Sequence, residues 1–324
     1  MSEDPKWKAG LLSSGLPLEY EAARLLASRG FRVDADFKHA WADGGVVKGF
    51  SVDLRARAHA PFSIPGQVSG TLDLVVECRH TRGDVSWLFL RDPNPPGGPA
   101  TVAGRTIRVV DEFSLCCVDA GPTAAFEAGL PICSKGLEID QVTGRVDDTE
   151  LGRGLGQLQY ALPRLIVESV MLCFGDQSNR NVPLLFCPVL LTTAPLLVAH
   201  GGLGVQEVER AAALQELATE VPYLATVSDY GPDFQAHCQR EFKALERLER
   251  NDGLLMVETK RAALCRSQRE LPLATIESLL AGDHYRLQDL FTRFIVCTRL
   301  GLPSLVEKIQ EAVEAAVQSR KELQ

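Results

Sequence analysis

Apolar residues recur with helical spacing in several stretches of the chain. In residues 15–28 the apolar stripe comprises Leu18, Ala22, Leu25 and Leu26, and Gly30 follows where the helix would end. Residues 155–172 predict a buried helix that Pro163 interrupts or kinks. Residues 205–219 predict an amphipathic helix, and the chain is expected to be mostly helical from Asp233 to its end.

Other stretches have the alternating or continuous apolar pattern of strands. They are residues 31–33, 45–56, 71–79 and 85–90, two strands within 182–200, and a short candidate strand at 253–257. Residues 92–104 have the composition of a loop. Prolines 183, 188 and 195 break the longest apolar run, so it does not predict a membrane helix. Helices and strands mixed in this way predict an α/β protein.

The last predicted helix, 304–322, carries Leu305, Ile309, Ala312, Val313 and Ala316 along one face. A stripe of this kind either packs on the parent domain or forms the interface of a homodimer. The pattern of residues alone leaves both alternatives open.

Composition limits the classes of protein. The net charge of −8 argues against a protein whose surface is largely covered by bound nucleic acid. The charge is uneven, because residues 1–110 carry a net charge of +2 and residues 111–324 a net charge of −10. The nine cysteines include no CxxC pair, which predicts reduced thiols in a cytoplasmic protein and no zinc site. The first ten residues lack the apolar stretch of a secretory signal.

Three acids and one arginine of the predicted helices and strands are candidate functional residues. Glu19 borders the apolar stripe of the first helix, where a carboxylate costs free energy unless it is paired or holds a metal. Glu21, by its spacing, faces solvent. Asp53 interrupts a strand-like run, and Glu77 and Arg79 stand about 6–7 Å apart on one face of the strand 72–80. A carboxylate beside a cation suits a metal site that binds phosphate.

This order, a helix Glu, a strand Asp and then Glu-x-Lys, resembles the PD-(D/E)XK nuclease superfamily, which includes restriction endonucleases and archaeal Holliday-junction resolvases. LEYEAARLLASRGF resembles the first helix of those resolvases, and VDL and VEC resemble their metal-binding strands. The resemblance covers residues 18–91. It implies a restriction-endonuclease-like mixed central sheet flanked by helices. It also implies that Glu19, Asp53 and Glu77 bind Mg²⁺, with Mn²⁺ as a substitute, for the hydrolysis of DNA.

The motif departs from the family at Arg79, which stands where the family has Lys. Arginine keeps the positive charge and can grip a phosphate through its planar fork, but it cannot accept a proton. If the cation acts only through its charge, catalysis survives the change. If a deprotonated amine is needed, the site is degenerate.

Other polar residues are weaker candidates. Gln157 begins a helix after the Glu-x-Lys strand, a place where this superfamily often has a Gln or Tyr. His80 and Arg82 follow the strand and either contact phosphate or lie in a solvated loop. The glycines of residues 152–156 and 200–204 lack the context of a nucleotide-binding loop, so no nucleotide cofactor is expected.

The sequence therefore predicts a nuclease-like domain at 1–204, with an insertion at about 92–150, and a mostly helical region at 205–324 that packs on it. DNA is the expected partner, and no membrane association is expected. The leading functional hypothesis is an Mg²⁺-dependent deoxyribonuclease of restriction, repair or phage defence. The alternative is a degenerate nuclease-fold protein that binds DNA or another protein.

Overall fold

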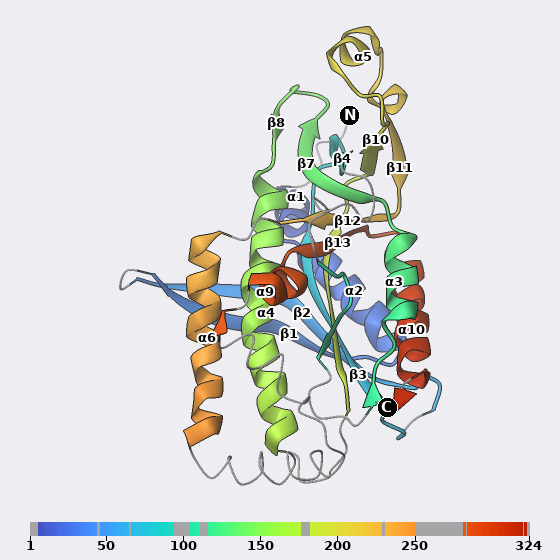
Figure 1. Ribbon diagram of the computed structural model, residues 1–324. Helices are drawn as coiled ribbons and strands as arrows, with labels where there is room; N and C mark the ends of the chain where they lie inside the picture. Colours follow the sequence, from blue (N-terminus) through green and yellow to red (C-terminus); the bar gives the residue numbers. More distant parts are fainter. Residues whose placement is uncertain are drawn as a thin grey trace.

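The computed structural model describes residues 6–43, 46–64, 66–93, 104–110, 116–175, 182–228, 231–250, 281–282, 284–319 and 321–322. A mixed sheet crosses the centre of the molecule and helices cover both of its faces (Figure 1). The predicted α/β class and the mixed central sheet flanked by helices are confirmed. Within the described residues no helix combines the length and apolarity that crossing a membrane requires.

The helices are α1 (Lys6–Ser13), α2 (Leu16–Ser28), α3 (Ala120–Ala128), α4 (Thr149–Gly175), α5 (Val205–Arg210), α6 (Pro232–Arg250), α9 (His284–Phe291) and α10 (Leu302–Gln318), with a 3-10 turn at Leu214–Glu216. The strands are β1 (Arg32–Asp43), β2 (Val46–Ala60), β3 (Gly70–Arg79), β4 (Val85–Arg91), β5 (Arg108–Val110), β6 (Cys116–Cys117), β7 (Ile132–Asp140), β8 (Val146–Asp147), β9 (Leu184–Thr192), β10 (Leu196–Ala199), β11 (Ala218–Val221), β12 (Tyr223–Val227), β13 (Arg293–Thr298) and β14 (Lys321–Glu322).

Within the described residues the main sheet has 12 strands: ten follow the order β1-β2-β3-β9-β13-β12-β7-β4-β10-β11, and off this path β5 pairs with β9 and β8 with β7. The first three strands form an antiparallel meander. β9 then lies parallel to β3, and β13 lies parallel to β9. The carboxyl ends of β3, β9 and β13 therefore meet at one edge, which is where loops that carry function gather in α/β sheets.

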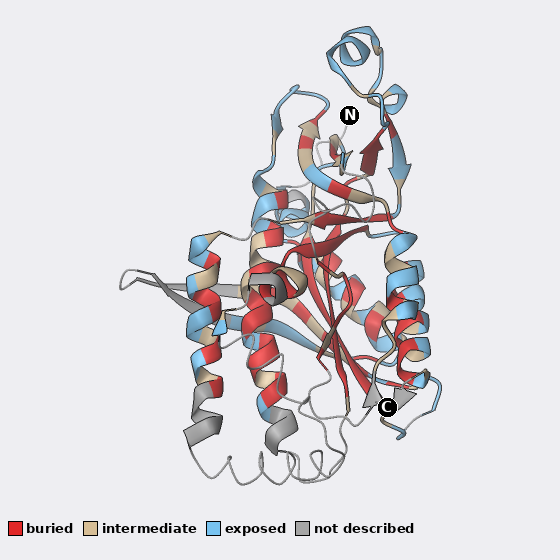
Figure 2. Ribbon diagram, viewed as in Figure 1, coloured by how far each residue is buried: buried red, intermediate tan, exposed pale blue. Residues whose placement is uncertain are grey.

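Two apolar cores lie on opposite faces of the sheet (Figures 1 and 2). One core joins α4, α6 and α9 to the sheet, and the other joins α2 and α10 to it. β3 and β9 are buried almost throughout because both of their faces are covered. Leu74, Val76 and Cys78 of β3 face one core while Val75 faces the other.

The apolar stripe of α10 is buried within the chain, so it packs on the parent protein, the first of the two alternatives. The helix predicted over the Pro163 region is continuous in α4, with the proline inside it. The described cysteine thiols, those of residues 78, 133, 187, 238 and 297, are buried and free. The candidate strand 253–257 lies outside the described residues, as do the positions of most of the loop 92–104.

The amphipathic helix predicted for residues 205–219 is wrong in its second half. α5 ends at Arg210, and β11 begins at Ala218, where it pairs with Ala199 of β10. The backbone hydrogen bonds of that hairpin override the helical spacing of the side chains. β12 and β13 also belong to the region 205–324, and both lie inside the main sheet between β9 and β7.

Candidate functional site

The candidate acids lie where β2 separates from β3. Regular pairing between the two strands ends with Leu54 opposite Val76. Beyond that pair the backbone N–H of Cys78 donates to Oδ2 of Asp53 at 2.7 Å. The side chain of Asp53 thus takes the place of a strand partner, and this contact fixes its carboxylate beside Glu77. The sheet places Asp53 and Glu77 on adjacent strands.

Glu77 is the most buried of the candidate acids, with 1% of its surface exposed. Nη2 of Arg79 lies 2.9 Å from its Oε1 and forms an ion pair. Neither carboxylate oxygen has a hydrogen bond of good geometry from the described residues. Burial, reinforced by the negative charge of Asp53, raises the pKa of Glu77 to about 8. A carboxyl with so little compensation is costly to keep ionised in the folded protein.

Glu19 approaches the same place from α2. A Cβ added to Gly15, which has a φ of 77°, would lie 3.2 Å from Oε1 of Glu19 and 4.0 Å from the carbonyl oxygen of Cys78. Only glycine adopts this backbone without strain and leaves the space open. Glu21 is exposed and pairs with Arg299, so the prediction that it faces solvent is confirmed.

The three carboxyls share one electrostatic environment. Burial raises the pKa of Glu19, and the charge of Asp53 raises it further. Burial also raises the pKa of Asp53, although the Cys78 N–H and the Arg79 guanidinium oppose the shift. Each group is therefore easier to ionise when a cation stands between them.

Arg79 is held by α4 on the opposite side. Its Nη2 donates to Oε1 of Gln157, and Nε2 of Gln157 donates to the carbonyl oxygen of Ser51 at 3.3 Å. The structure thus brings the predicted Gln157 to the site, where it orients the guanidinium. Nε of Arg79 lies 3.9 Å from Oε2 of Glu150.

The start of α4 is fixed by Glu138 of β7. Its Oε1 accepts hydrogen bonds from the backbone N–H groups of Glu150 and Leu151 at 2.6 and 2.9 Å. These are N–H groups of the first helical turn, which have no partner within the helix. Glu138 therefore fixes the position of the first turn of α4, the helix whose side chains contact Arg79.

Sequence reasoning did not identify Glu150. The one local signal is its position seven residues before Gln157, which places both side chains on the same side of α4. The Cys78 N–H was also missed, because a backbone donor becomes available only where the partner strand departs.

Two weaker candidates lie just beyond β3. His80 is half-buried. Arg82 is mostly exposed and pairs with Asp140 at 2.5 Å and with Asp84 at 3.6 Å, so its charge faces the end of β7.

Asp73 lies four residues before Glu77 on the same face of β3. It is buried and receives hydrogen bonds from both Arg55 and Arg57, the shortest at 2.6 Å. Those two arginines are thereby held on the sheet by an acid, and Asp73 serves as their common acceptor.

The donor set can be tested against the metal that the family resemblance implies. Carboxylate oxygens suit a hard cation, and the two oxygens of Glu77, which accept no hydrogen bond from the described residues, are the kind of atom that such a cation satisfies. The distances between the candidate ligands fit less well. Among the described residues, no three His, Cys, Asp or Glu side chains lie close enough together to hold a metal ion as they stand. The site thus fits Mg²⁺ in its chemistry but does not form a closed cage.

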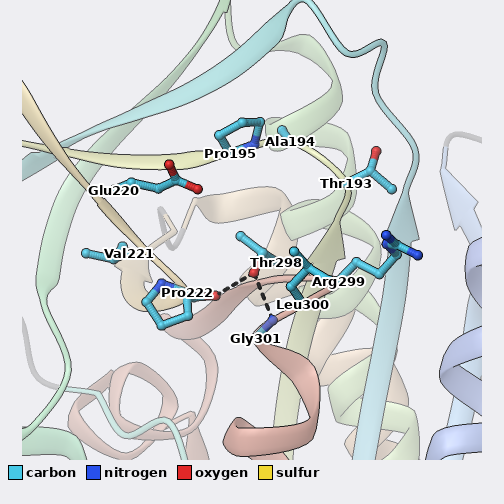
Figure 3. A pocket seen from close by; sticks show the side chains of 10 residues that line it. All are labelled: Thr193, Ala194, Pro195, Glu220, Val221, Pro222, Thr298, Arg299, Leu300 and Gly301. Carbon is cyan, nitrogen blue, oxygen red and sulfur yellow. Dashed lines mark hydrogen bonds between the residues drawn. The ribbon is translucent and has the colours of Figure 1, made fainter. Parts of the chain in front are cut away.

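A pocket of about 470 Å³ lies next to the end of β3 (Figure 3). It is lined by the turn after β9, the end of β11 with the residue before β12, and the end of β13 with the turn after it: Thr193, Ala194, Pro195, Glu220, Val221, Pro222, Thr298, Arg299, Leu300 and Gly301. Thr193 connects it to the site, since its N–H donates to the carbonyl oxygen of Arg79 and its hydroxyl accepts from the N–H of Thr81. No sequence pattern marked this pocket, because its walls come from three segments, 193–195, 220–222 and 298–301, that are distant in the chain.

No protein-family model, curated protein or solved structure matches this chain.

Proposed function

We propose that this protein is an Mg²⁺-dependent deoxyribonuclease with a restriction-endonuclease-like fold. The observation that carries the proposal is the carboxyl of Glu77, which is buried, paired with Arg79 and next to two further acids. Replacing a buried ion pair as a whole by apolar residues is often neutral or stabilising, so stability alone does not account for this pair. The mixed sheet supports the proposal, since Asp53 and Glu77 lie on adjacent strands and Glu19 on the helix before them.

Asp53 and Glu77 would hold the ion, with Glu19 as the third acid. When bound, Mg²⁺ supplies an activated water and offsets the charge that develops on the scissile phosphate. Arg79, oriented by Gln157, binds a phosphate oxygen through its fork. It cannot take the proton of the attacking water. In this proposal the proton goes to Glu19, because Glu77 is buried and Asp53 accepts the Cys78 N–H, whereas Glu19 is half-exposed.

A nuclease assay tests the proposal directly. The wild-type chain is incubated with plasmid, linear and branched DNA in Mg²⁺ or Mn²⁺, beside Glu77→Ala and a control, Glu307→Gln, which changes an exposed acid of α10. We expect wild type and control to cleave and Glu77→Ala to be at least about 100-fold slower, as for the loss of a group that stabilises the transition state. Equal cleavage by wild type and Glu77→Ala would exclude this site.

A second candidate function is a nuclease-fold protein that binds without cleaving. The specific observation in its favour is the ion pair between Arg79 and Glu77, because the guanidinium partly neutralises the acid that a metal would otherwise need to satisfy. The incomplete ligand group points the same way. Arg79→Lys separates the two functions: if wild type is inert and this variant cleaves DNA, the natural site is degenerate.

A further inference from the structure

Apolar side chains gather on the exposed sides of α1 and α2. Trp7 is 69% exposed and Tyr20 is 65% exposed, and Leu11, Leu12 and Leu16 are exposed between them. We call this group of five residues the α1–α2 face. Large side chains of this kind are costly to leave in water, and when they cluster they mark a site of interaction.

The α1–α2 face borders the candidate site. Gly15 lies in the turn between the two helices, and a Cβ built on it would lie 3.2 Å from the Glu19 carboxylate and 4.0 Å from the carbonyl of Cys78. Leu16 and Tyr20 are one helical turn apart on α2, the helix that also carries Glu19. A ligand that lies along this face would therefore pass beside the helix and the turn that border the acids.

Positive charge is interleaved with the aromatic rings. Lys6 and Lys8 flank Trp7, and all three are exposed. The guanidinium of Arg24 lies 6.0 Å from the centre of the Tyr20 ring. Glu21, the exposed acid of α2, is paired with Arg299, which offsets its charge.

Exposed rings between cations are the features that recognise a single-stranded nucleic acid. Unpaired bases stack on aromatic side chains while the cations follow the phosphates. In a duplex the base faces are covered by their neighbours, so rings on a helix surface cannot stack on them. The cations also distinguish this surface from a purely apolar protein-docking site, because they would be poorly paired against an apolar partner.

We propose that the α1–α2 face binds a single-stranded DNA segment next to the scissile phosphate, so that the substrate is single-stranded or has a single-stranded branch. The inference deepens the proposed nuclease function and rests on it for the cleavage step. Binding itself needs no divalent ion and no hydrolysis, so it can be measured separately.

The test is fluorescence anisotropy with labelled oligothymidylate in EDTA, with the corresponding duplex and anionic phospholipid vesicles as comparison probes. The variants are Trp7→Ala and Tyr20→Ala, and the matched control is Val205→Ala, which removes an apolar side chain that is 76% exposed on α5. We expect each aromatic variant to lose at least about fivefold in affinity, the lower bound for one stacked base. The control should bind as wild type does.

Two further readouts identify the contact. In a Trp41→Phe background the remaining tryptophans are Trp7 and the fully buried Trp87, so stacking on Trp7 should quench tryptophan emission and Trp7→Phe should abolish that quenching. Lys6→Gln should flatten the salt dependence of binding, because it removes one phosphate contact.

The proposal is overturned if wild type fails to bind the oligonucleotide, or if the aromatic variants bind it as tightly as wild type. It is also overturned if the face instead binds vesicles, or if Trp7→Ala abolishes a dimer in sedimentation while DNA binding is unchanged. Wild-type binding that depends on Trp7 and Tyr20, without cleavage of any DNA, would refute the nuclease function and leave the binding face intact.

Discussion

Replacing Glu77 with glutamine should stabilise the protein at high pH. The side chain keeps its shape and loses its charge. In the folded protein the pKa of Glu77 is raised from 4.5 to about 8 by burial and by Asp53. Between these two pH values the unfolded chain has lost its proton while the folded chain retains it. The free energy of unfolding of wild type therefore falls as the pH rises from 4.5 to 8, and above 8 this contribution changes no further.

The size of the effect follows from the shift. At about 1.4 kcal/mol per pH unit, ionised Glu77 costs the folded state on the order of 5 kcal/mol at pH 9. The glutamine variant avoids that cost but buries an amide with incomplete hydrogen bonds, which costs about 1–3 kcal/mol. We expect Glu77→Gln to be more stable than wild type by about 2–4 kcal/mol at pH 9. The gain should disappear by pH 5.

Urea unfolding from pH 5 to 9, followed by circular dichroism, measures this difference. A second series contains Mn²⁺, which binds the ionised acid. At 100 times its dissociation constant, Mn²⁺ should add about 2.7 kcal/mol to wild type and much less to Glu77→Gln. The metal would then offset most or all of the stability difference that the charge alone produces.

Stability curves that run parallel for the two proteins would refute the reasoning, because they would show that Glu77 is ionised at no cost. Failure of Mn²⁺ to distinguish the two proteins, with the pH dependence as expected, would retain the buried acid and refute the metal site.

Two substitutions test the packing that supports the site. Arg108→Met removes a fully buried guanidinium that donates to the carbonyls of Thr106, Leu290 and Arg293. Urea unfolding should show that the free energy of unfolding falls by about 2–5 kcal/mol. A fall below about 0.5 kcal/mol would mean that these carbonyls find other donors. Gly301→Ala places a Cβ 2.5 Å from the carbonyl oxygen of Pro222 and should lower stability by about 1–3 kcal/mol. Gly202→Ala, which meets nothing within 4 Å, is its control, and equal stability of the two variants would contradict the crowding.

Local pattern predicted the elements around the site well. β3 and β9 were identified from apolar runs, and α2 from its stripe, because each buries an apolar face that its own sequence displays. The region after α5 was predicted wrongly, since pairing with β10 decides its structure and that partner is not local. The order of strands in the sheet could not be predicted from local sequence pattern either, because it depends on contacts between segments that are distant in the chain.

For the site, the sequence identified Glu19, Asp53 and Glu77, and the structure places them in one electrostatic environment. The spacing of the acids was not predictable, because it depends on where β2 leaves β3. The contact between Arg79 and Gln157 joins residues 78 positions apart; the family resemblance suggested Gln157 as a candidate but not this contact.

The position of β12 and β13 affects how the chain can fold during synthesis. Both strands stand between β9 and β7, although they follow all the residues of those two strands in the chain. Until the last third has left the ribosome, β9 and β7 each keep an open edge that can pair with a strand from another chain. We therefore expect nascent fragments that stop before β13 to aggregate. The acids on β2 and β3 should acquire a rigid support only after β12 and β13 have paired with β9 and β7.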